Sequence, residues 1–237
     1  MNKQLKLNLL IDICMFILLL GCMSYSLIGI NIHEYIGIAL CILFIIHCFN
    51  HQKYYYSLFH FKFNLQKIIF FIINLGTLIS MLGLIISSLI FLDYIPNIYD
   101  INLINFARIM HLLSAYWGFC FISLHCGLHW KMIYNLILKR LPIAINKILQ
   151  AFPKINLILS LIIAFYGLNS FLHYDLLSYM FYQNNFVFFD PTQSLLLFIL
   201  DYISISGLFI TLAHYGLKLI PISDFKFCLK KDNIHIS

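Results

Sequence analysis

The sequence predicts an all-α integral membrane protein with about six transmembrane helices. Of its 237 residues, 62% are hydrophobic and only 10% are charged, and the mean hydropathy is +0.91. A soluble domain usually carries about 25% charged residues. The apolar residues also gather in runs that are long enough to cross a bilayer, which takes roughly 20 helical residues. Backbone groups in lipid are satisfied only in helices or closed barrels, and runs of this length are helical.

Six apolar runs are the candidate membrane spans. They cover residues 7–30, 33–50, 67–92, 106–130, 154–172 and 195–219. The first run follows Lys3 and Lys6, an arrangement that resembles a signal peptide. The run is nevertheless about long enough to cross the bilayer, and no A-x-A-like cleavage site follows it. We therefore expect it to be retained as the first transmembrane helix.

The basic residues predict the orientation of the spans, because Lys and Arg concentrate on the cytoplasmic side. All of the 15 basic residues except Arg108 fall on one side if both termini are cytoplasmic. The opposite side receives Asp93, Asp100, Asp175 and Asp190. The sequence therefore predicts a multi-pass protein of the cell (inner) membrane with both termini in the cytoplasm. The net charge of +6 reflects this topology and does not indicate nucleic-acid binding.

The seven cysteines are scattered and form no C-x-x-C pair. This spacing argues against covalent c-type haem attachment and against a zinc ribbon. Two acidic residues, Asp12 and Asp201, lie inside apolar runs, and the sequence alone assigns neither of them a role.

Histidines at matched positions on the second and fourth spans are the strongest functional signal. The separation from His33 to His47 is 14 residues, as is that from His111 to His125. Fourteen helical residues rise about 21 Å and come within about 40° of a whole number of turns. The two spans run in the same direction, so His33 and His111 share the outer level and His47 and His125 the inner level. Such pairs suit the two axial positions of low-spin haem iron.

A second register of the same helices stays open. His33 to His51 and His111 to His129 are both 18 residues, or five whole turns with a rise of about 27 Å. We prefer the 14-residue pairs, in which His51 and His129 lie beside the haem propionates or serve as alternative ligands. Arg108, one turn before His111, is either a propionate partner or an interfacial anchor. Small residues such as Gly37, Gly118 and Gly127 are candidates for the gaps that haem edges need.

These residues also resemble a known family. The segments His33-Glu34-Tyr35-Ile36-Gly37 and His125-Cys126-Gly127-Leu128-His129-Trp130, with Arg108-x-x-His111 and Tyr116-Trp117-Gly118, are similar to the flavinylation-associated cytochrome family. The likeness covers roughly residues 5–130 and extends to the four-helix core of respiratory cytochrome b. It implies a four-helix haem-binding bundle within 5–140, followed by two additional transmembrane helices and a cytoplasmic tail within 141–237.

The resemblance further implies two haem b groups, with His33 and His111 holding the outer one and His47 and His125 the inner one. Electrons would pass between a membrane quinol or cytosolic donor and extracytoplasmic redox proteins that carry flavin or iron–sulfur centres. Quinone is a further candidate ligand, and the chain would be an electron-transfer subunit and not a stand-alone enzyme. The alternative is a haem-free transporter or scaffold, in which the histidines serve helix packing or metal passage.

Overall fold

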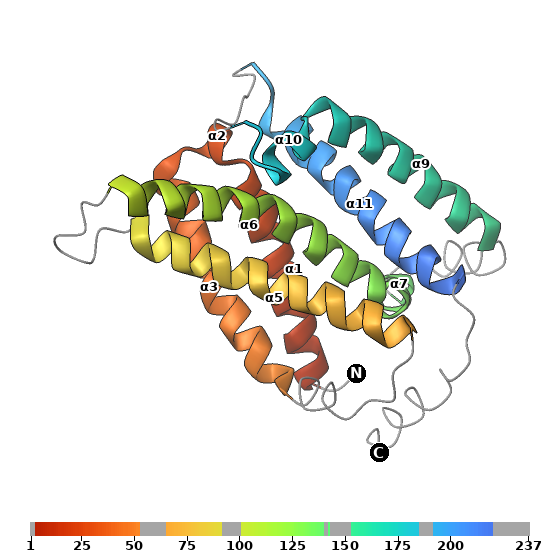
Figure 1. Cartoon of the computed structure of the whole chain (residues 1–237). Coiled ribbons are helices and arrows are strands. Elements are labelled where there is room, and N and C mark those ends of the chain that lie inside the picture. The colour runs from red at the N-terminus through yellow and green to blue at the C-terminus, as the bar shows by residue number, and fades with distance from the viewer. Residues whose placement is uncertain are drawn as a thin grey trace.

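The computed structural model describes residues 3–52, 65–91, 101–139, 142, 153–184 and 192–219, and these residues form an all-helical protein (Figure 1). The long helices are α1 (Lys3–Met23), α3 (Ile30–Asn50), α5 (Leu65–Phe91), α6 (Ile101–Leu128), α9 (Pro153–His173) and α11 (Leu195–Leu219). Each is long and apolar enough to cross a membrane, which confirms the predicted multi-pass helical membrane protein. The predicted C-terminal tail lies outside the described residues, as do many of the charged loop residues that predict the orientation.

The boundary between the first two spans differs from the prediction. Helix α1 ends at Met23, seven residues earlier than predicted, and a single-turn helix α2 (Tyr25–Ile28) follows it. Gly29 then adopts φ +80°, in the left-handed region that glycine enters without a steric penalty. The chain reverses there, and α3 begins at Ile30. Hydropathy did not show this boundary because the turn residues are themselves mostly apolar.

Pairs of spans that follow one another in the chain pack as antiparallel neighbours, whereas α6 and α11 run parallel (Figure 1). Helix α1 packs against α3, and α5 packs against α6. On its other side α6 packs against α11, which in turn packs against α9, so the last two spans extend the bundle. Among the described helices, α3 and α6 approach each other mainly through their side chains, since their backbones pack less closely than those within the α1–α3 and α5–α6 pairs.

Two short helices lie at opposite ends of the bundle (Figure 1). Helix α10 (Leu176–Met180) packs on α6, where the indole of Trp117 donates a hydrogen bond of 2.8 Å to the carbonyl of Met180. The ring of Tyr116 stacks on that of Tyr179 with centroids 5.0 Å apart. At the other end, α7 (Trp130–Leu138) follows α6 after a break at His129. Aromatic packing from α10 therefore covers the middle of α6, between His111 and His125.

Candidate functional site

The structure brings the predicted outer histidines together. His33 lies near the start of α3, and His111 lies on α6. Their ring centroids are 6.1 Å apart, with the ring planes inclined by 63°. An imidazole nitrogen binds a metal ion at about 2.0–2.1 Å, so two rings that hold one metal ion between them have centres roughly 6 Å apart. The spacing of the outer pair therefore suits axial ligation of a single metal ion.

Each outer ring is oriented by a neighbour on the adjacent helix. The Nδ1 atom of His33 lies 3.1 Å from the carbonyl oxygen of Cys22, and that of His111 lies 3.0 Å from the hydroxyl of Ser87. Ser87 has a single hydroxyl proton, which it donates to backbone carbonyls of its own helix. Its hydroxyl oxygen lies 2.7 Å from the carbonyl oxygen of Gly83 and 3.0 Å from that of Leu84. Toward His111 the hydroxyl is therefore an acceptor. Both outer histidines donate from Nδ1, and the lone pair of each Nε2 is left for a ligand bond.

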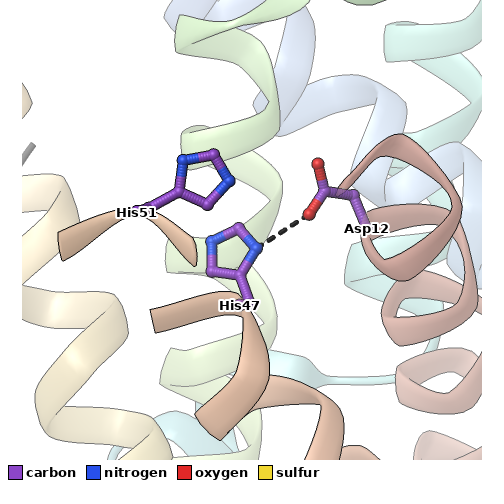
Figure 2. Close-up of side chains that lie close together, drawn as sticks. All are labelled: Asp12, His47 and His51. Carbon is purple, nitrogen blue, oxygen red and sulfur yellow. Dashed lines mark hydrogen bonds and ion pairs between the residues drawn. The ribbon is translucent and has the colours of Figure 1, made fainter. Parts of the chain in front are cut away.

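The inner histidines follow the same rule. The Nδ1 atom of His47 lies 2.8 Å from a carboxylate oxygen of Asp12, on α1 (Figure 2). The Nδ1 atom of His125 lies 2.6 Å from the amide oxygen of Asn74, on α5. Carboxylate and amide oxygens are acceptors, so both inner rings also carry their proton on Nδ1. An imidazole that binds metal through one nitrogen and donates from the other to a fixed acceptor is the usual arrangement in metalloproteins.

The orienting partners give the site an internal symmetry that the sequence did not reveal. In the α1–α3 pair, α3 carries two histidines, and α1 supplies Asp12 and the carbonyl of Cys22. In the α5–α6 pair, α6 carries two histidines, and α5 supplies Asn74 and Ser87. Sequence reasoning assigned none of these partners a role. Asp12 was marked only by its place in an apolar run, and Asn74 and Ser87 are polar residues of a kind that membrane helices often carry.

The second-register histidines lie beside the inner pair. The ring centroids of His47 and His51 are 4.6 Å apart, and those of His125 and His129 are 5.0 Å apart. All four rings and Asp12 are close enough to interact electrostatically. His51 lies where α3 ends, and His129 lies at the break between α6 and α7. Both therefore stand at the edge of their spans.

His51 and His129 are neutral at pH 7. Burial lowers the pKa of His51, as does the neighbouring His47, while Asp12 opposes this. Burial also lowers the pKa of His129. The Nε2 atom of His51 is buried and has no hydrogen-bond partner. Ligand atoms of Asp12, His47 and His51 lie within 4.8 Å of one another, which makes these three residues a candidate metal site (Figure 2).

The predicted supporting residues divide into those that fit a cofactor gap and those that do not. Arg108 is exposed on α6, one turn before His111. A Cβ atom added at Gly37 meets nothing within 4 Å, so open space adjoins α3 one turn after His33. At Gly118 a Cβ atom would lie 3.1 Å from Cβ of Ser80, and at Gly127 it would lie 2.7 Å from Cβ of Ala213. These two glycines serve close helix packing, and their interpretation as gap residues was wrong.

A separate polar cluster joins α9 to α11. One carboxylate oxygen of Asp201 accepts hydrogen bonds from Tyr166 at 2.7 Å and Ser170 at 3.3 Å, and the other accepts one from Tyr174 at 2.8 Å. The amide of Gln193 donates to the Tyr174 hydroxyl. Burial raises the pKa of Tyr174 to about 12, so this phenol keeps its proton for Asp201. The second acidic residue of the apolar runs thus holds two membrane helices together.

The donor set suits haem b, because four imidazoles on two parallel helices use Nδ1 for hydrogen bonds to neighbouring helices, which leaves Nε2 at two levels. The chain was compared with protein-family models, with curated proteins and with solved structures, and none of the three comparisons gives a match.

Proposed function

We propose that the chain is a membrane-embedded b-type cytochrome that relays electrons across the membrane. The observation that carries this proposal is the common hydrogen bonding of the four histidines. In His33, His47, His111 and His125 the Nδ1 atom lies 2.6–3.1 Å from an oxygen atom on the neighbouring helix. A histidine that served only helix packing would be satisfied by either nitrogen. Four histidines that all hydrogen-bond through Nδ1 leave Nε2 to bind a metal ion, as a bis-histidine centre at each level requires.

Haem b would be held at the outer level by His33 and His111 and at the inner level by His47 and His125. When bound, its iron supplies reversible one-electron chemistry. The protein residues orient the imidazoles, and aromatic side chains of α6 and α10 pack between the two levels. The 14-residue spacing places the two levels about 21 Å apart along the helices, which suits passage across the roughly 30 Å hydrocarbon core.

The distribution of basic residues supports cytoplasmic termini in the cell (inner) membrane, because nearly all of them fall on one side of the six spans. The electron donor is then a quinol or a cytosolic protein, and the acceptors are extracytoplasmic proteins with flavin or iron–sulfur centres. These partners are the ones that the resemblance to the flavinylation-associated cytochrome family implies. The chain acts as an electron-transfer subunit of a larger oxidoreductase system.

A reduced-minus-oxidised spectrum of the protein purified in detergent tests the proposal. The expected result is a b-type α-band, with two haems per chain by pyridine haemochrome. A protein that folds and holds no haem, after expression in cells supplied with haem, contradicts it.

A second candidate function is binding of a divalent transition metal at the inner level without haem. The observation that favours it is the convergence of Asp12, His47 and His51, since two imidazoles and a carboxylate suit zinc or ferrous iron. Elemental analysis of the purified protein separates the two candidates. Stoichiometric zinc or non-haem iron that disappears in His51→Ala supports the metal site, and iron that matches the haem content supports the cytochrome.

A further inference from the structure

The orienting partners differ in charge between the two levels. At the outer level, His33 and His111 donate to the carbonyl of Cys22 and the hydroxyl of Ser87, which are both neutral. At the inner level, His125 donates to the neutral amide of Asn74, but His47 donates to the carboxylate of Asp12 (Figure 2). Of the four ligand histidines assigned above, only His47 is therefore bonded to a full negative charge.

A carboxylate that accepts the Nδ1 proton of a ligand imidazole makes the imidazole a more basic ligand. A more basic ligand stabilises ferric iron relative to ferrous iron, and second-shell hydrogen bonding is one of the means by which proteins set haem potentials. The negative charge also favours the more positively charged, oxidised form of a nearby centre. Both effects of Asp12 lower the reduction potential of the inner level.

The other charges near the two levels do not cancel this difference. Glu34 and Arg108 near the outer pair carry opposite charges. Both of them, and Lys131 beyond the inner pair, are exposed, and solvent screens exposed charges.

We infer that Asp12 makes the inner level the lower-potential one, so that electron transfer from the inner to the outer level is downhill. This inference rests on the proposed function. One electron leaves the inner level, which is oxidised, and arrives at the outer level, which is reduced, with no bond made or broken. With cytoplasmic termini, the downhill step leads toward the extracytoplasmic acceptors of the proposed function.

The order of the two potentials is tested by optical redox titration of single-level variants. His111→Ala leaves only the inner level, and His125→Ala leaves only the outer level. The inference expects the haem of His111→Ala to titrate at the lower potential. Equal potentials, or a lower potential in His125→Ala, overturn it. Absence of haem from the unsubstituted protein contradicts the proposed function instead, so the two failures are distinguishable.

The role of Asp12 is tested by Asp12→Asn, which keeps an acceptor and removes the charge. We expect the ferric–ferrous equilibrium of the inner level to change by a factor of about ten, so that its reduction potential rises by ~59 mV for one electron. The reduction potential of the outer level should stay unchanged. Asp175→Asn is the control, because it removes an exposed carboxylate at the start of α10, a helix that carries none of the ligand histidines, and it should change neither potential. An unchanged inner potential, or an equal rise of both potentials, overturns the role of Asp12. If Asp12→Asn loses the inner haem, Asp12→Glu, which keeps the negative charge, and the order of the two single-level potentials test the role of Asp12 instead.

Discussion

The hydrogen bond between His125 and Asn74 allows a direct test of how the ligands are oriented. Replacing Asn74 with leucine, a residue of similar volume, removes the acceptor 2.6 Å from Nδ1 and leaves a buried N–H without a partner. Such an orphaned group costs about 1–3 kcal/mol. Loss of an orienting partner typically weakens metal binding by about 10–100-fold, which is roughly 1.4–2.8 kcal/mol. We therefore expect Asn74→Leu to weaken haem retention at the inner level by about 10–100-fold.

The assay is competition for haem with an excess of an apo-protein acceptor, followed optically in detergent. One of the two haems should leave Asn74→Leu about 10–100 times more readily than it leaves the unsubstituted protein, and the other should be unaffected. Thr77→Val is a suitable control on the same helix, since the Thr77 hydroxyl donates only to the carbonyl of Ile73, at 2.9 Å. Equal retention in Asn74→Leu and the control, or matching loss of both haems, would refute the reasoning.

Three further outcomes are expected. His33→Ala and His111→Ala should each halve the haem content. Because both residues serve one level, the double variant should lose no more haem than either single variant. A fully haem-free double variant would contradict this. His51→Ala and His129→Ala should keep both haems by pyridine haemochrome, whereas loss of one haem in His129→Ala together with full retention in His125→Ala would establish the 18-residue register. Asp201→Leu should lower the melting temperature in detergent, since it removes three hydrogen bonds worth about 0.5–1.5 kcal/mol each. The control Tyr35→Phe, on the exposed face of α3, should leave the melting temperature unchanged. Equal melting temperatures of the two variants would show that the cluster does not join α9 to α11.

The spans and the levels of the histidines could be predicted from the sequence because both depend on local properties. Hydropathy identifies an apolar helix, and the helical period fixes which of its residues share a face. The 14-residue spacing therefore predicted that His33 would meet His111, and the structure brings these rings together. The end of α1 was predicted wrongly because it depends on the backbone conformation of Gly29, which a hydropathy window does not detect.

The orienting partners could not be predicted because they depend on how one helix is rotated against its neighbour. Asn74 and Ser87 are ordinary polar residues of α5 until its packing on α6 brings them against His125 and His111. The same packing explains why Gly118 and Gly127 were misinterpreted, since their missing side chains admit Ser80 and Ala213 and do not open a cofactor gap. Asp12 was visible as a charge in an apolar run, but its partner His47 lies 35 residues away.

The most direct test of the central claim is the haem content of the purified, unsubstituted protein, measured by pyridine haemochrome alongside a reduced-minus-oxidised spectrum. Two haem b groups per chain, with the spectrum of low-spin bis-histidine iron, are the expected result. A folded protein without haem, or one whose haem survives replacement of all four of His33, His47, His111 and His125, would contradict the account.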